Sequence, residues 1–262
     1  MKRVTVLRSL AGIAGVAAPY AVAAATPPGV TVFAAASLRE AFEAAAPAFT
    51  KLTRTPVTYV FGGSDMLLTQ LAQGAPADVF ASAAEAQMEA ASARGLLAEP
   101  PRVFARNHLI VIVRKDNPAR ITGVAGLATP GVKIVLTAAS VPVGSYARAA
   151  FRTLNGKPGY PPDFDALVER NIVSNELDVK AVATKIALGE GDAGVVYATD
   201  VTPRIAARVA RIPFPAGAAP TAVYPIAPVN GAANAAGARA FVAFITSPQG
   251  QTFLRARGFA AP

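Results

Sequence analysis

The chain of 262 residues is long enough for one large or two medium domains, and its 53% hydrophobic content excludes a disordered protein. Its formal net charge of +9 contains no block of five or six like charges, and only 7% of the residues are aromatic, which disfavours nucleic-acid binding. Because the chain has no cysteine, it can form neither a disulfide nor a lipid-bearing thiol.

The first 25 residues have the pattern of a secretory signal peptide. Lys2, Arg3 and Arg8 flank an apolar run, Leu10–Ala25, that ends in small residues. This run is too short and too rich in alanine to span a bilayer, which takes roughly 20 apolar residues. We therefore expect residues 1–25 to be removed and the mature protein to be soluble and located in the periplasm.

Two similar segments follow, each with a short β-branched strand, small residues, a serine and a helix. The predicted strands are Val30–Phe33 and Val57–Phe61, and the predicted helices are Leu38–Phe49 and Met66–Ala72. Ser37 and Ser64 stand where the helices begin, which makes Ser37 a candidate N-cap. In an open α/β sheet both serines would face one crevice, where helix N-termini can hold an oxyanion.

The remaining segments predict an excursion into a second domain. We place the crossing near Asn107 and the return near Tyr224, where prolines permit an extended connector but not a helix. Before the crossing we expect a strand at Val79–Ala81 and a helix at Ala84–Arg94. Between the crossings we expect strands at Leu109–Val113, Val132–Leu136, Ile172–Ser174, Ala193–Tyr197 and Val209–Ile212, a turn at Val141–Ser145, and helices at Tyr146–Leu154 and Asp178–Leu188. After the return we expect helices at Ala235–Ile245 and Pro248–Arg257, packed on the first domain.

Catalytic motifs are poorly represented. His108 is the single histidine, and the chain has neither a nucleophile elbow nor a phosphate-loop glycine pattern. Metal-ligand clusters are absent from the sequence as well. Since His108 begins an apolar strand without a carboxylate partner nearby, we interpret it as structural. The chain is therefore not predicted to be an enzyme, although a secreted serine hydrolase using Ser37 or Ser64 remains an alternative.

Four segments together resemble the periplasmic molybdate-binding proteins of ABC importers. They are VTVFAAASL (residues 30–38), GAPADVF (74–80), VPVGSYA (141–147) and GVVY (194–197), and they occur in the family's order and spacing. The resemblance covers nearly the whole mature chain. It implies a type II periplasmic binding protein, an α/β fold with two lobes, each a mixed β-sheet flanked by helices, and a ligand cleft between them. Residues 28–106 with 224–262 would form one lobe, and residues 107–223 the other.

The resemblance also implies the ligand set. Ser37 and Ser64 would donate hydroxyl and backbone N–H hydrogen bonds from one lobe. Val143, which stands where the family often has alanine, and Val179 would donate backbone N–H groups from the other lobe, and Tyr197 would donate its phenolic O–H. The anion would thus be gripped from both sides only when the lobes close. Neutral donors can replace water around a dianion without the tight binding that a full counter-charge gives.

The ligand that the resemblance implies is a tetrahedral oxyanion, molybdate and also tungstate, handed to an inner-membrane ABC permease. Molybdenum would enter only as this bound oxyanion, and we expect no cofactor, no nucleic-acid partner and a monomeric protein. A binding protein for phosphate, sulfate or a small organic anion is the alternative within the same class.

Asp65 departs from the family pattern, which has a small polar residue after the second serine. In the interpretation that we favour, Asp65 faces solvent in the first turn of its helix and gains about 0.3–1 kcal/mol from the helix dipole. In the other interpretation its carboxylate enters the cleft, where it would repel a dianion but accept a proton from hydrogen phosphate.

Overall fold

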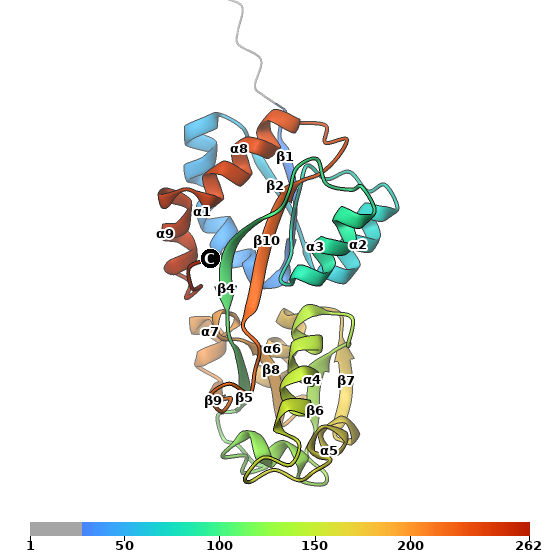
Figure 1. The fold of residues 1–262 in the computed structure, drawn as a ribbon. Coiled ribbons are helices and arrows are strands. Elements are labelled where there is room, and N and C mark those ends of the chain that lie inside the picture. Colours follow the sequence, from blue (N-terminus) through green and yellow to red (C-terminus); the bar gives the residue numbers. More distant parts are fainter. Residues whose placement is uncertain (1–27) are drawn as a thin grey trace, which may run out of the picture.

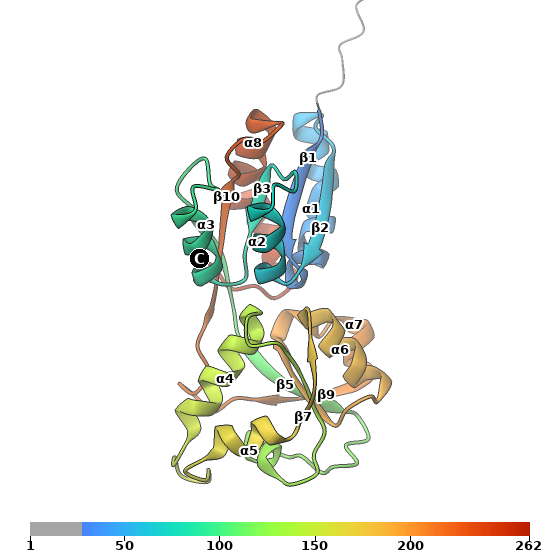
Figure 2. The same ribbon diagram turned by 90° about the vertical axis from the view of Figure 1, so that its right-hand side faces the viewer.

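The computed structural model describes residues 28–262, so the predicted signal peptide lies outside the described part of the chain. Two lobes, drawn one above the other in Figure 1, are joined by two extended segments. Within residues 28–262 each lobe contains a mixed five-stranded sheet with helices on both faces (Figures 1 and 2). The predicted two-lobed α/β architecture is therefore confirmed.

The sheet of the first lobe is parallel in one half and antiparallel in the other. Its strands lie in the order β2 (Val57–Gly62), β1 (Val30–Ala35), β3 (Val79–Ala81), β10 (Ala222–Pro228) and β4 (Arg102–Asn107). β2, β1 and β3 are parallel, whereas β10 runs antiparallel to both β3 and β4. The carboxyl ends of the three parallel strands therefore meet at one edge of the sheet, where ligands commonly bind in α/β proteins.

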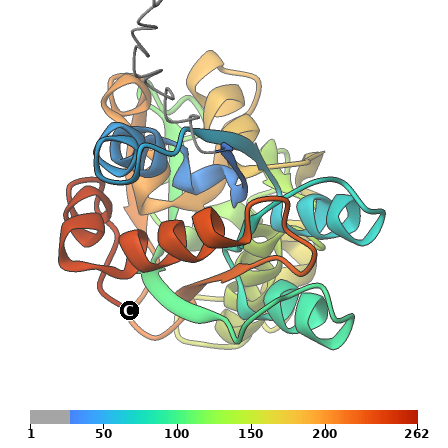
Figure 3. The same cartoon turned by 90° about the horizontal axis from the view of Figure 1, so that it is seen from above.

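Both faces of this sheet are buried, and β1 sends alternate side chains to opposite sides, so its residues contribute to a core on each face. Val32 and Ala34 join the core beneath α1, α8 and α9, whereas Phe33 joins a second core beneath α2 and α3. These helices are α1 (Arg39–Thr53), α8 (Ala235–Thr246), α9 (Pro248–Arg255), α2 (Ser64–Ala72) and α3 (Glu85–Ala93). In Figures 1 and 3 the C-terminal helices α8 and α9 lie beside α1, so they pack on the first lobe, as predicted.

The sheet of the second lobe has α4 on one face and α6 on the other (Figure 2). Its strands lie in the order β7 (Ile172–Glu176), β6 (Ile134–Thr137), β8 (Ala193–Tyr197), β5 (Leu109–Arg114) and β9 (Val209–Pro213). The helices are α4 (Pro142–Leu154), α5 (Phe164–Arg170), α6 (Val179–Leu188) and α7 (Pro203–Ala206), with short 3-10 turns η2 (Val124–Ala128) and η3 (Ala198–Asp200). Among the residues described, no helix combines the length and apolar character needed to cross a membrane.

Two segments carry the chain between the sheets. β4 belongs to the first sheet and β5 to the second, and only His108 separates them. The chain returns between β9, at the edge of the second sheet, and β10 in the first. The return segment was predicted to be an extended connector, but it is a core strand, buried along its whole length. The register shifts between Tyr224 and Pro225, and this irregularity accommodates a proline that cannot donate to the ladder.

Two local predictions are also wrong. Val141–Ser145 is the beginning of α4 rather than a turn, with Pro142 at the first helical position, where its missing N–H costs nothing. Ser37 is not an N-cap, because it lies inside the 3-10 helix η1 (Ala36–Leu38) and its hydroxyl bonds to Tyr224. The strand β4 and the helix α5 were not predicted at all.

Candidate functional site

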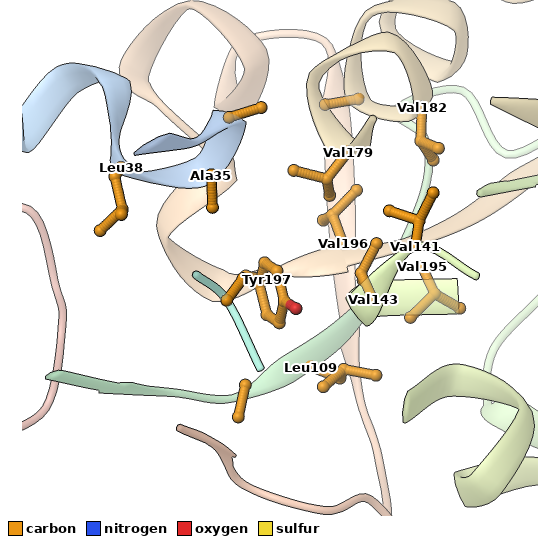
Figure 4. Packing of buried hydrophobic residues seen from close by; sticks show 14 of the residues in the cluster. Ala35, Leu38, Leu109, Val141, Val143, Val179, Val182, Val195, Val196 and Tyr197 are labelled. Carbon is orange, nitrogen blue, oxygen red and sulfur yellow. The ribbon is translucent and has the colours of Figure 1, made fainter. Parts of the chain in front are cut away.

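A small cavity between the lobes, of about 10 Å³, is lined by all five candidate ligand residues. Ser37 and Ser64 come from the first lobe, whereas Val143, Val179 and Tyr197 come from the second. The other lining residues are small or apolar, namely Ala35, Ala36, Gly63, Ala83, Val141 and Pro142. In Figure 4 the hydroxyl oxygen of Tyr197 points toward Val143, with Val179 close by. Residues far apart in the sequence thus meet at one place.

The protein holds both serine hydroxyls by hydrogen bonds. Ser37 follows β1, and its hydroxyl oxygen lies 2.9 Å from that of Tyr224. Ser64 is the first residue of α2, and its hydroxyl oxygen accepts a 3.0 Å hydrogen bond from the backbone N–H of Ala83. Both serines are buried. Their hydroxyls therefore have fixed positions at the wall of the cavity.

The second lobe places two helix N-termini at the same cavity. Val143 and Val179 stand in the first turns of α4 and α6, where backbone N–H groups have no acceptor within the helix. Asp178 caps α6 by accepting hydrogen bonds from Lys180 and Ala181, at 2.8 and 3.1 Å. Since this cap does not involve the N–H of Val179, that group is available to a ligand.

Tyr197 ends β8, and its side chain is 1% exposed. Within residues 28–262 its hydroxyl has no hydrogen-bond partner. Burial raises the pKa of Tyr197 well above its usual value, so the phenol keeps its proton and remains a donor at neutral pH. A buried donor without an acceptor costs free energy, and an anion oxygen in the cavity would supply that acceptor.

The arrangement is suited to a small anion held by neutral donors. No charged side chain belongs to the lining of this cavity in the described part of the chain. The N-termini of α2, α4 and α6 contribute unpaired N–H groups and the positive ends of their dipoles. Two serine hydroxyls and one phenol add directional donors. Chemically, such a site can replace the hydration shell of an oxyanion from several sides at once.

The same geometry gives a serine hydrolase no support. His108 is exposed and is not part of the cavity lining. The hydroxyls of Ser37 and Ser64 bond to Tyr224 and to the N–H of Ala83 rather than to a base. Among residues 28–262, no group of three or more histidine, aspartate or glutamate residues could hold a metal ion.

Asp65 contacts the second lobe, contrary to the interpretation that it faces solvent. It is half-buried, and its Oδ2 accepts a 2.6 Å hydrogen bond from the hydroxyl of Ser140. Gln87 of α3 also reaches Ser140, donating to its carbonyl oxygen at 3.2 Å. Asp65 is not among the cavity-lining residues, so the alternative role as an acceptor for a phosphate proton gains no support. The position of Asp65 in the first turn of α2 was predicted from the sequence, whereas its contact with the second lobe was not.

A second contact between the lobes involves charged groups. Lys180 of α6 lies 2.7 Å from Oε2 of Glu40 on α1 and 3.1 Å from Oδ1 of Asp200. Burial alone would lower the pKa of Lys180, but the two carboxylates outweigh it and raise that pKa. These three residues also line a cavity of about 280 Å³ together with Arg204 and Arg208. Its mixed charges suit a dianion less well than the neutral donors of the smaller cavity.

Asp200 is fully buried, and burial raises its pKa from 3.8 to about 6, although Lys180 counteracts the rise. Between these two values the folded protein holds a proton that the unfolded chain has released. The contribution of Asp200 to stability therefore falls as the pH rises from about 4 to 6 and is constant above. Relative to Asp200→Asn, we expect the natural chain to lose about 2–3 kcal/mol of unfolding free energy over this range. Urea unfolding of both proteins at pH 4, 5, 6 and 7 measures the difference.

Subtracting the Asp200→Asn curve removes the titration of every other carboxyl group that the two proteins share. Parallel stability curves would contradict the prediction and would mean that Asp200 titrates at its ordinary pKa in the folded protein. A stability gain with rising pH would mean that the attraction of Lys180 outweighs burial.

Sequence reasoning missed the residues that hold the serines. Tyr224 was assigned only to a connector, and Ala83 contributes a backbone group that its side chain does not reveal. For Tyr224 a signal did exist, because a tyrosine within an apolar run usually needs a partner for its hydroxyl. For Ala83 the sequence contains no such signal.

Comparison with known sequences agrees with this geometry. Residues 30–260 match the profile of the family described as bacterial extracellular solute-binding protein. The chain is 39% identical over 234 residues to the molybdate-binding protein ModA of Mycobacterium tuberculosis, a match that covers 89% of this chain and 85% of that protein. The resemblance expected from the four sequence segments is therefore confirmed.

Solved structures show the same fold. The periplasmic molybdate-binding protein of Azotobacter vinelandii matches with a TM-score of 0.74 and 22% identity, covering 89% of this chain and 99% of that one. The sulfate-binding protein SubI of Mycobacterium tuberculosis matches with a TM-score of 0.77 and 19% identity, covering 90% and 87%. At these identities the two structures establish the fold, and the choice of anion depends on the site itself.

Proposed function

Because the chain belongs to the family of bacterial extracellular solute-binding proteins, we propose that it captures molybdate between its lobes and delivers it to an ABC importer. Relatives of this kind bind solutes rather than convert them, and we extend this to the present chain. The 39% identity to a protein named for molybdate binding supports the choice of anion. A single structural observation carries the proposal, which is the convergence of neutral donors from both lobes on one small cavity.

The assigned donors are the hydroxyls of Ser37, Ser64 and Tyr197 and the backbone N–H groups of Val143 and Val179. Since three of the five come from the second lobe, a bound anion would link the lobes and favour the closed arrangement. Binding by hydrogen bonds without a counter-charge leaves the anion able to dissociate when the lobes separate, as delivery to a permease requires.

The donor set also favours an anion without a proton. Hydrogen phosphate carries an O–H group that needs an acceptor, and the cavity lining contains no carboxylate. Molybdate, tungstate and sulfate are fully deprotonated at neutral pH and lack this requirement. We propose that tungstate binds as molybdate does, and that the larger tetrahedral anions are preferred over sulfate by size.

The remaining parts of the proposal concern the state of the protein. We propose that residues 1–25 direct export to the periplasm, that the mature chain acts as a monomer, and that it has no catalytic activity or cofactor. An inner-membrane permease is the partner to which the closed, loaded protein would deliver its anion.

Calorimetric titration of the purified, ligand-stripped protein with molybdate tests the proposal, and Tyr197→Phe assigns the site. This change keeps the ring in its packing and removes only the hydroxyl. A charge-assisted hydrogen bond of roughly 1.5–3 kcal/mol is lost, so we expect affinity for molybdate to fall by about one to two orders of magnitude. Without ligand, the melting temperature should not fall, because this buried hydroxyl has no hydrogen-bond partner in the described part of the chain.

Tyr160→Phe is a matched control, because Tyr160 lies in the same lobe but does not line the cavity. Its affinity for molybdate should equal that of the natural chain. If Tyr197→Phe instead lowers stability and leaves affinity unchanged, Tyr197 is a packing residue and the two-sided grip is wrong. If phosphate or sulfate binds more tightly than molybdate, the choice of anion is wrong.

A further inference from the structure

Tyr224 connects the anion-binding cavity to the crossing between the lobes. It is buried in β10, with its hydroxyl oxygen 2.9 Å from that of Ser37 and 3.4 Å from Nδ2 of Asn107. Asn107 is the last residue of β4, where the chain leaves the first lobe. Its Nδ2 also donates a 2.8 Å hydrogen bond to the hydroxyl of Thr199 in the second lobe.

These contacts have a direction. Asn107 uses its Oδ1 to accept a 3.0 Å hydrogen bond from the backbone N–H of His108, which fixes the orientation of the amide. The amide nitrogen can only donate, so the hydroxyl of Tyr224 accepts from it. In residues 28–262, Ser37 provides the one hydrogen-bonded acceptor for the Tyr224 proton. Either hydroxyl of the Tyr224–Ser37 pair could be the donor. Because the Tyr224 oxygen already accepts from Asn107, we assign Tyr224 as the donor, which leaves the proton of Ser37 free to point into the cavity.

Ser64 shows the same arrangement by a different route. Its hydroxyl oxygen accepts from the N–H of Ala83, which again leaves its own proton free for the cavity. Each serine thus has a protein donor behind it. An anion accepts hydrogen bonds only, so a serine already oriented as a donor loses less free energy of ordering when it binds.

We infer that Tyr224 is a positioning residue, which orients the hydroxyl of Ser37 as a donor to the bound oxyanion, and that Asn107 sets the direction of the Tyr224 hydroxyl. This inference rests on the proposed function, because it assigns a role in binding the anion of that same cavity. Tyr224 touches no ligand itself and acts through Ser37.

A double-mutant cycle separates this role from packing. Tyr224→Phe keeps the ring, which packs edge-on against Phe259 and Tyr197 with centroids 5.4 and 5.7 Å apart, and removes the hydroxyl. We expect the dissociation constant for molybdate to rise about tenfold in the natural background. In the Ser37→Ala background the same change should have no further effect, because the hydroxyl that Tyr224 orients is gone.

Tyr59→Phe is the matched control. The hydroxyl of Tyr59 lies in the same lobe and donates to the carbonyl oxygen of Phe42 at 2.9 Å, away from the cavity. Its removal should leave the affinity for molybdate unchanged. Melting of each ligand-free variant establishes that it is folded, and Asn107→Ala takes the place of Tyr224→Phe in the cycle if the latter is unfolded.

The outcomes are distinct. An effect of Tyr224→Phe that vanishes in Ser37→Ala supports the inference. An effect of equal size in both backgrounds means that Tyr224 acts through packing, and it overturns the inference while the proposed function stands. A natural chain that fails to bind molybdate overturns the proposed function, and the inference with it.

Discussion

Molybdate at about a thousandfold its dissociation constant is expected to raise the free energy of unfolding by roughly 4 kcal/mol. The physical reason is linkage, because the anion binds the folded, closed protein and has no comparable site on the unfolded chain. For a protein of this length, such a gain corresponds to an increase of about 8–16 °C in melting temperature. Thermal unfolding of the ligand-stripped protein, with and without molybdate, measures it directly.

Several anions make the experiment selective. Tungstate should give a shift similar to that of molybdate, whereas sulfate and phosphate should give smaller shifts at the same concentration. Chloride at matched ionic strength controls for general screening of a basic protein. Phosphate producing the largest shift would contradict the prediction. Loss of that phosphate shift in Asp65→Asn would then show that the carboxylate of Asp65 reaches the anion after all.

The order of elements was largely predictable because the local signals agree with the fold. The apolar runs of β1, β5 and β8 are continuous, as expected for strands buried on both faces, and their bounds follow the predicted ranges within a few residues. The strand β4 was missed because Arg102 and Arg106 make it look like a loop. It lies at the edge of its sheet, where charged residues are tolerated.

Interactions between distant segments could not be derived from local patterns. Ser37 looked like an N-cap because a serine before a helix usually is one, yet its partner is a tyrosine 187 positions away. Asp65 looked exposed because only its own helix was visible, although Ser140 of the other lobe covers it. In both cases the side chain bonds to an element whose position depends on the complete fold.

The candidate ligand residues show two kinds of information that local sequence patterns do not contain. For Val143 and Val179 the side chains carry no information, since the proposed donors are backbone N–H groups. The resemblance to molybdate-binding proteins pointed to them, and the structure places both at helix starts beside the cavity. For Tyr197 the strand pattern predicted a buried residue, but not that its hydroxyl would lack a partner among residues 28–262.

Gly63→Ala is expected to weaken molybdate binding by about three orders of magnitude, because it keeps the lobes from closing. Gly63 precedes α2 with a φ of −61°, a conformation open to any residue, so the change causes no backbone strain. A Cβ at this position would lie 2.5 Å from the carbonyl oxygen of Leu177 in the second lobe. Carbon and oxygen atoms cannot approach that closely, so the lobes must remain farther apart.

The size of the effect follows from what separation removes. The donors assigned to the second lobe are the N–H groups of Val143 and Val179 and the hydroxyl of Tyr197, each worth roughly 1.5–3 kcal/mol to an anion. Because the lobes can still approach each other in part, we expect only part of this sum to be lost, and about 4 kcal/mol corresponds to about a thousandfold in affinity. The added methyl group would also lie 2.7 Å from Oδ1 of Asp65 in its own lobe, but this carboxylate is the far end of a side chain outside both cores and can move aside. The melting temperature of the ligand-free variant should therefore change little.

Gly123→Ala is the matched control, because a Cβ there meets nothing within 4 Å and the residue lies away from the cavity. Its affinity should equal that of the natural chain. Small-angle scattering with molybdate adds a structural measurement, in which the natural chain and Gly123→Ala become more compact and Gly63→Ala does not. If Gly63→Ala binds molybdate normally, the anion does not need the lobes to close, and the donors of the second lobe contribute little to the grip.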